Sequence, residues 1–243
     1  GLQMYSKREI IALNIANMLH DGDFVNLGVG MPTLVGRYIP RDITVWLHGE
    51  NGCVGQDATI TGTQEEMQRW KAEHGGEDSD WKTGHRDLIN ASCEYVTLLP
   101  GGCCFDSSIA FAMARGGHLD ATVLGGLQVD EEGNLANWMV PGKRVPGMGG
   151  AMDLVCGAKK VIIAMEHCTK DGEPKLLKRC TMPLTAVACV DVVVTEFCIL
   201  ERRGGQFVVT AMNPEIDREE LIKITEMELV FDKRLHVMEM PAD

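Results

Sequence analysis

The sequence carries little positive charge relative to its negative charge. Its 243 residues include 23 lysines and arginines against 35 aspartates and glutamates, which gives a formal net charge of −12. Binding to nucleic acid requires a basic face that neutralises phosphates. The charge balance therefore argues against nucleic acid as a partner. It leaves room for a small anionic ligand held by backbone amides and a few local lysines.

Long apolar runs and metal-binding patterns are also missing. No stretch approaches the roughly 20 apolar residues of a membrane span, and the first residues lack the apolar core of a signal peptide. The nine cysteines are odd in number and contain no C-x-x-C pair, and the seven histidines show no metal-ligand spacing. We therefore expect a cytoplasmic protein with no membrane association, no metal and no disulfides, in which even Cys53 packs rather than reacts.

Aromatic residues are scarce, whereas glycine and methionine are abundant. Aromatics make up 5% of the chain, against 27 glycines and 14 methionines. This composition favours close backbone packing and adaptable apolar contacts. The apolar content of 45% is ordinary for a globular protein and permits a full core without disulfides.

Helical and strand-like patterns alternate along most of the chain. Capping boxes, helical periodicity and glycine stops predict helices that begin at Ser6, near Pro32, at Asp106, at Ala151 and at Arg218. Short apolar runs predict strands over 24–27, 43–47, 95–99, 121–124, 161–165 and 228–231, with a hairpin at 202–205. The alternation predicts one α/β domain over 1–243, a mostly parallel sheet with helices on both faces and hairpin additions. A polar stretch at about 57–88 is interpreted as an insert, and it contains a further capping box at Thr63 and Glu66.

Three glycine-rich turns, at 28–32, 49–55 and 147–150, are expected at one edge of this sheet. In an open α/β sheet, ligands bind beyond the carboxyl ends of the strands. The turn at 28–32 resembles the opening of a dinucleotide fingerprint, but Pro32 and the lack of a glycine at residue 33 break that pattern. The turn at 147–150 opens a helix, so its amides could hold a phosphate or an oxyanion, or it could simply be a tight turn.

The turn at 49–55 carries Glu50 directly after an apolar run. A carboxylate on a glycine-rich turn after a strand can act as a nucleophile toward a ligand, although most glutamates in turns are merely solvated. Ser107 and Ser108 lack a G-x-S-x-G elbow, which argues against a serine hydrolase. Local spacing alone leaves both interpretations of Glu50 open.

A series of ordered motifs bears on that choice. His48–Gly55 resembles the Ser-Glu-Asn-Gly signature of family I CoA-transferase β subunits, and Gly28–Pro32 resembles the family's Gly-x-Gly-x-Pro. The family's Phe-Asp-Ser, Arg-Gly-Gly-His, Leu-Ala-Asn-Trp, Pro-Gly-Lys and Gly-Met-Gly-Gly-Ala-Met-Asp-Leu blocks stand at 105–107, 115–118, 135–138, 141–143 and 147–154. The resemblance runs in order from about residue 5 to 235 and is strongest to the 3-oxoacid and butyrate–acetoacetate enzymes.

The resemblance implies a reaction and a nucleophile. It implies ping-pong transfer of CoA between short-chain acyl-CoA and a carboxylate of the acetate, butyrate or acetoacetate class, through a thioester on Glu50. A glutamate near its reference pKa of about 4.3 is ionised at neutral pH and needs no activating base. Coenzyme A is then a substrate, and no cofactor is expected.

The resemblance also assigns roles to the glycine-rich turns and to a partner. It implies that Gly149 or Gly150 supplies a backbone amide to the oxyanion, that Asn51 orients the turn or the carboxylate, and that Gly52 lets the backbone fold around it. The residues expected to line the CoA channel are Gly28, Val29, Gly30 and Met31. The family's α subunit carries its own glycine-rich CoA motif, which has no equivalent here, so we expect a separate α subunit to complete the enzyme.

The chain departs from the family in two places. Gly49 replaces the usual serine before the glutamate, and the stretch 57–88 is longer than the usual connection to Asp87–Ala91, which suggests a lid, a subunit contact or a surface excursion. Alternative functions are an acyl-CoA hydrolase that uses the same glutamate, a non-catalytic binding subunit and a sugar-phosphate isomerase on a related fold. The sequence leaves the acyl chain length open.

Overall fold

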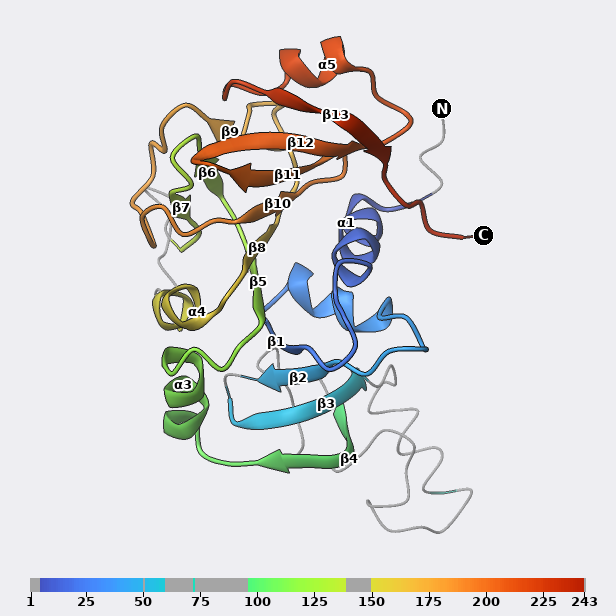
Figure 1. The fold of residues 1–243 in the computed structure, drawn as a ribbon, viewed down its shortest axis with the longest axis vertical. Helices are drawn as coiled ribbons and strands as arrows, with labels where there is room; N and C mark the ends of the chain where they lie inside the picture. Colours follow the sequence, from blue (N-terminus) through green and yellow to red (C-terminus); the bar gives the residue numbers. More distant parts are fainter. Residues whose placement is uncertain (1–4, 50, 60–71, 73–95, 139–149, 243) are drawn as a thin grey trace.

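A ten-stranded sheet runs through the molecule (Figure 1). The computed structural model describes residues 5–49, 51–59, 72, 96–138 and 150–242. The strand order is β13-β12-β11-β10-β8-β5-β1-β2-β3-β4. The strands are β1 (Phe24–Leu27), β2 (Trp46–Gly49), β3 (Cys53–Thr59), β4 (Val96–Cys104), β5 (Ala121–Gly125), β8 (Val161–Ala164), β10 (Val192–Val194), β11 (Cys198–Arg203), β12 (Gln206–Met212) and β13 (Val230–Val237).

The centre of the sheet is parallel and its flanks are largely antiparallel. Strands β2, β1, β5, β8 and β10 pair in parallel. Antiparallel pairing adds β3 and β4 beside β2 and adds β11 and β12 beside β10, and β13 pairs in parallel with β12. The central strands are continuous buried runs such as Val-Ile-Ile-Ala and Val-Val-Val, as expected for parallel strands covered on both faces. A second sheet contains β6 (Gln128–Asp130), β7 (Leu135–Ala136) and β9 (Leu176–Leu177).

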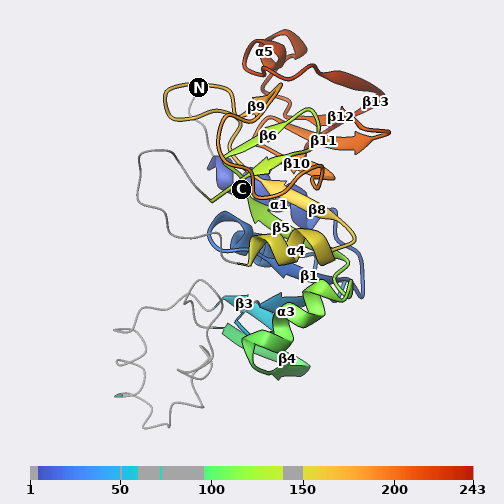
Figure 2. The same cartoon turned by 90° about the vertical axis from the view of Figure 1, so that its left-hand side faces the viewer.

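Helices cover both faces of the large sheet (Figures 1 and 2). Helix α1 (Lys7–Ala16) and the 3₁₀ helix η1 (Met31–Arg37) lie on one face, and α3 (Ser107–Arg115) and α4 (Ala151–Gly157) lie on the other. Each face has its own core: Ile10, Ile15 and Val35 belong to one apolar cluster, whereas Ala114 and Leu154 belong to another. Helix α5 (Arg218–Lys223) lies beside β13. This arrangement confirms the α/β class predicted from the sequence.

The helix starts predicted at Ser6 and Asp106 are confirmed. Ser6 and Glu9 form the reciprocal hydrogen bonds of a capping box at the start of α1, and Asp106 caps α3 by accepting the Ile109 N–H. The hairpin predicted at 202–205 joins β11 to β12. The box at Thr63 and Glu66 and most of the predicted insert lie outside the described residues.

Several element boundaries differ from the predictions. The helix near Pro32 is a 3₁₀ helix, whose turns close with bonds such as Thr33 N–H to the Gly30 carbonyl. Strand β2 continues past the predicted end at residue 47 to Gly49, and Gly55 lies inside β3 rather than in the turn. The last strand is longer than predicted because pairing with β12 carries it to Val237. Among the described helices, none has both the length and the apolar composition needed to cross a membrane.

His167 is a buried histidine that serves the core. It follows β8, and its ring lies 2.7 Å from Thr225 Oγ1 through Nε2 and 2.9 Å from Thr195 Oγ1 through Nδ1. Because the Thr225 hydroxyl donates to the Leu221 carbonyl, its oxygen is free to accept the Nε2–H of a neutral ring. Burial and the nearby Lys175 charge lower the pKa of His167 to about 4. The neutral ring is therefore the form that the fold stabilises.

This pKa predicts a loss of stability on acidification. Unfolding restores an ordinary histidine pKa of about 6.5, so below that pH the unfolded state binds a proton that the folded state does not accept until about pH 4. We expect His167 to lower the free energy of unfolding by about 2 kcal/mol between about pH 7 and about pH 5. Urea unfolding of the wild type and of His167→Gln at both pH values measures this contribution. Equal pH dependence in the two proteins would contradict it.

Candidate active site at the end of strand β2

The β2–β3 hairpin places the residues on either side of Glu50. Strand β2 ends at Gly49, which pairs with Cys53 at the start of β3, and the Gly52 N–H donates to the Gly49 carbonyl at 3.0 Å. Asn51 is exposed to solvent. Glu50 itself lies outside the described residues, so its predicted role rests on the sequence and on the placement of these neighbours.

Gly52 fixes the hairpin against the segment that leads into α3. Its φ is +114°, and a Cβ atom there would lie 1.9 Å from the Phe105 carbonyl oxygen. The Phe105 N–H donates to the Gly52 carbonyl at 2.7 Å, so the two backbones are in direct contact. Only glycine fits this position, which gives a physical reason for the glycine in the Glu-Asn-Gly motif. The contact also joins the motif at 48–55 to the Phe-Asp-Ser block at 105–107.

The side chain of His48 anchors the end of β2 to β1 and α3. The side chain is 1% exposed, and its Nε2 lies 3.0 Å from the Ala110 carbonyl, which can only accept a hydrogen bond. The Nδ1 atom therefore accepts from the Asn26 amide at 3.0 Å, and the same amide also donates to the His48 carbonyl. Burial lowers the pKa of His48 and keeps the ring neutral. This network ties β1, β2 and α3 together, and sequence reasoning missed it although a polar residue in a buried apolar run was the available signal.

Strand direction brings the predicted glycine-rich turns to one edge of the sheet. Because β1, β2, β5 and β8 are mutually parallel, the turns after Leu27 and Gly49 both follow carboxyl ends. Helix α4 directly precedes β8 and lies on one face of the sheet, so it runs antiparallel to the strands. It therefore begins at the carboxyl edge, with Gly150 as its N-cap. The structure thus gathers Gly28, Gly52 and Gly150 at this edge. Gly149 lies outside the described residues.

The turn after β1 combines a fixed start with an exposed tip. The Gly28 N–H donates to the Val123 carbonyl at 2.8 Å, and a Cβ atom at Gly28 would lie 3.0 Å from that oxygen. Val29 is 57% exposed, Gly30 is also exposed, and Met31 begins η1. The role of this turn in a CoA channel stays a prediction.

Cys53 packs against a second thiol. Its Sγ lies 3.2 Å from Sγ of Cys104, the residue opposite it on β4. Burial and the neighbouring Cys104 raise the pKa of Cys53 to about 12, so the reactive thiolate is scarce at neutral pH. The eight described cysteines are all free. Among the described residues, no group of three or more His, Cys, Asp or Glu side chains is arranged to hold a metal ion.

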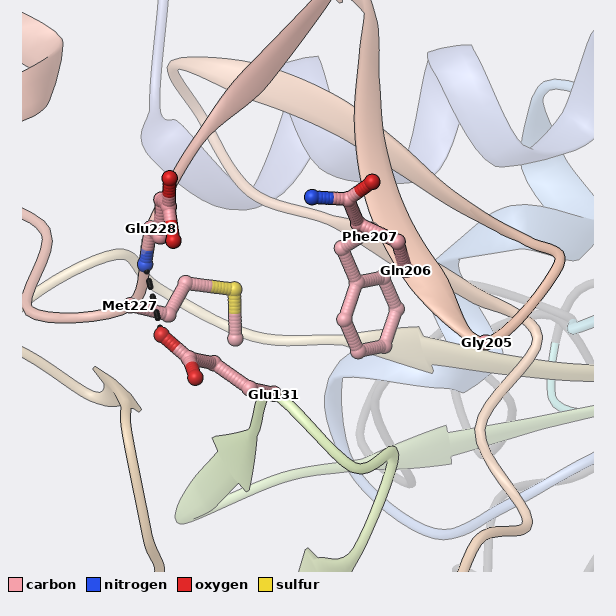
Figure 3. A pocket seen from close by; sticks show the side chains of 6 residues that line it. All are labelled: Glu131, Gly205, Gln206, Phe207, Met227 and Glu228. Atoms are coloured by element: carbon pink, nitrogen blue, oxygen red, sulfur yellow. Dashed lines mark hydrogen bonds between the residues drawn. The ribbon is translucent and has the colours of Figure 1, made fainter.

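A cavity lies at the opposite edge of the sheet (Figure 3). It has a volume of about 250 Å³, and its lining includes Phe207, Met227, Glu131 and Glu228. The backbone N–H of Glu228 donates to the Glu131 carboxylate at 2.8 Å. It adjoins the β11–β12 turn, which lies beyond the amino end of β10 because β11 runs against β10. Its two carboxylates disfavour an anionic ligand such as CoA. The cavity is therefore separate from the candidate site.

Comparison with known proteins identifies the family. The model of the coenzyme A transferase family matches residues 8–223, so this chain belongs to that family of CoA-transferring enzymes. The chain is 48% identical over 223 residues to the acetate CoA-transferase subunit beta of Haemophilus influenzae, covering 92% of this chain and 91% of that one. It is 50% identical over 203 residues to the acetate CoA-transferase subunit beta of Escherichia coli, covering 84% of each chain.

A solved structure supports the fold. An acyl-CoA transferase from Escherichia coli superposes with a TM-score of 0.70 at 19% identity, over 96% of this chain and 43% of that chain. At this level of identity the likeness shows the fold alone. It agrees with the mostly parallel sheet and its helical layers.

The contact of Gly52 with Phe105 predicts a large effect of Gly52→Ala. The methyl group must displace the Phe105 backbone and the residue must keep a positive φ, so we expect the free energy of unfolding to fall by about 2–4 kcal/mol. Gly22→Ala is the matched control, because Gly22 has a φ of +83° but no atom within 4 Å of its added Cβ. The control should lose only about 1 kcal/mol. Equal losses in urea unfolding would contradict the close contact.

Proposed function

We propose that this chain is the β subunit of a cytoplasmic CoA-transferase that moves CoA between a short-chain acyl-CoA and a carboxylate of the acetate, butyrate or acetoacetate class. The observation that carries the proposal is the hairpin that follows the parallel strand β2, whose fixed residues Gly49 and Gly52 flank Glu50. The carboxyl edge of such a sheet is where ligands bind in α/β proteins. The two relatives named as acetate CoA-transferase beta subunits, at 48% and 50% identity, support the substrate class.

Glu50 is the proposed nucleophile. Its carboxylate attacks the carbonyl carbon of acyl-CoA and expels CoA thiolate, which leaves a mixed anhydride on the enzyme. The thiolate then attacks the glutamyl carbonyl, which forms the glutamyl-CoA thioester and releases the first carboxylate. The acceptor carboxylate repeats both steps in reverse order, so that acyl-CoA leaves and the Glu50 carboxylate is restored.

Each step passes through a tetrahedral centre with a developing negative charge on oxygen. Fixed N–H donors stabilise such a charge because they need no reorganisation during the reaction. Gly150, at the amino end of α4, and Gly149 before it are the proposed sources of a backbone donor, since the first amides of a helix have no partner within it. Asn51 is proposed to orient the turn.

An α subunit is proposed to complete the enzyme. Both bacterial relatives are named as subunit beta, and the chain covers only 43% of the Escherichia coli acyl-CoA transferase chain. The exposed turn at Val29 and Gly30 is proposed to line the CoA channel that the two subunits share. The α subunit would then supply the remaining CoA contacts.

The proposal predicts a covalent CoA adduct on Glu50. The α–β complex is incubated with acyl-CoA without an acceptor, and its peptides are analysed by mass spectrometry. The adduct should map to Glu50 and be absent from Glu50→Gln, whose transfer rate should fall by at least about 10⁴-fold because the nucleophile is lost. Glu219→Gln, an exposed glutamate in α5, is the matched control and should keep both the adduct and the rate.

The same complex separates the alternative functions. Transfer to acetate with little release of free CoA supports a transferase, whereas rapid release of free CoA in the absence of an acceptor indicates a hydrolase. Active enzyme with the adduct at another residue, or with none, would overturn the role of Glu50. A folded complex that shows neither transfer nor hydrolysis would indicate a binding subunit.

A further inference from the structure

The side chain of Gln56 occupies the place that a side chain at residue 49 would take. A Cβ atom added to Gly49 would lie 2.1 Å from Gln56 Nε2 and 2.7 Å from Asn51 Oδ1. The family's Ser-Glu-Asn-Gly signature carries serine at this position. A serine at residue 49 therefore does not fit here unless Gln56 moves. The glycine at 49 and the glutamine at 56 form one complementary pair across the hairpin.

A β-bulge directs Gln56 to this place. Gln56 is the partner of Leu47 on β2, whereas Val54 is the partner of His48, so the register shifts around Gly55, which has a φ of +80°. The extra residue places Gln56 on the same side of the hairpin as Leu47 and Gly49, and not on the side of His48. Its amide consequently lies next to the residue that precedes Glu50.

The Gln56 amide nitrogen is a buried donor with no partner. The residue is 8% exposed, and its Nε2 makes no hydrogen bond within the described part of the chain. By contrast, the amide of Gln128, which is also 8% exposed, donates to the Thr181 hydroxyl at 2.9 Å. Burying an unsatisfied amide is unfavourable, so a stability role does not account for Gln56. An oxygen of a ligand that binds during the reaction would accept the hydrogen bond that this amide can donate.

We propose that Gln56 is a catalytic residue that donates a hydrogen bond from Nε2 to an oxygen of the reacting carboxyl or acyl group beside Gly49. The donor comes from β3 and takes the place of the serine hydroxyl that the family signature carries on β2. This inference rests on the proposed CoA transfer at Glu50 and adds a residue to that site. The donor is fixed before the reaction by burial and by the bulge, which is the property that makes such donors effective.

A double-substitution cycle at 49 and 56 tests the proposal in the α–β complex. Gln56→Met keeps the side-chain length but removes the donor, so kcat should fall by about 100-fold, the lower end of the loss seen when one fixed donor is removed. Because a donor to a carboxylate lowers its pKa, the acid limb of kcat/KM should also move to higher pH. Gln206→Met, at an exposed glutamine on the opposite edge, should leave kcat and the pH profile unchanged.

The second substitution uses the space that Gln56 leaves. Gly49→Ser alone should lose activity because its side chain displaces the Gln56 amide. Gly49→Ser combined with Gln56→Met restores a donor from β2 and should recover kcat to within about 10-fold of the wild type, which is strong non-additivity. A purely structural role for Gln56 would not produce this recovery.

The outcomes separate this inference from the proposed function. Wild-type kcat and an unchanged pH profile in folded Gln56→Met would overturn the role of Gln56, as would a double variant no better than either single one. If those results occur while the CoA adduct still forms on Glu50, only the Gln56 inference fails. If no adduct forms on Glu50 in active wild type, the proposed function fails first. Thermal melting of each variant establishes that losses of activity do not come from unfolding.

Discussion

The backbone contact between Gly52 and Phe105 is the constraint on which the candidate site depends. It holds the β2–β3 hairpin against the start of α3, where a hydrogen bond of 2.7 Å and the absence of a Cβ atom allow the two backbones to meet. His48 anchors the other side of the same strand end through Asn26 and Ala110. Together these contacts fix the backbone on either side of Glu50, and the nucleophile proposed there needs such a fixed position to meet a carbonyl carbon.

The fold was largely predictable from the sequence because its signals are local. Capping boxes and buried apolar runs identify α1 and β8 directly, and alternation of the two patterns predicts the parallel sheet. The differences arise where pairing with a neighbour extends a strand, as in β13, or where a helix closes with 3₁₀ hydrogen bonds, as in η1. Such effects depend on partners that are distant in the sequence or on hydrogen bonds that a pattern does not specify.

The candidate site divides in the same way. The places of the glycine-rich turns after β1 and β2 could be predicted because the residues that define them are adjacent in sequence, whereas the role of Glu50 stays a prediction. The roles of His48 and Gln56 could not, because one depends on packing against α3 and the other on a register shift at Gly55. The sequence shows only that Gly49 stands where the family carries serine, whereas the structure shows that the Gln56 side chain occupies the space beside it.

The central claim is that a carboxylate of this chain exchanges an oxygen atom with the substrates, and heavy-oxygen-labelled acetate tests it most directly. After turnover of the α–β complex with acyl-CoA and labelled acetate in ordinary water, mass spectrometry should find the heavy oxygen in the side chain of Glu50, because the mixed anhydride passes one acceptor oxygen to the glutamate. Catalytic turnover that leaves Glu50 unlabelled would contradict the account.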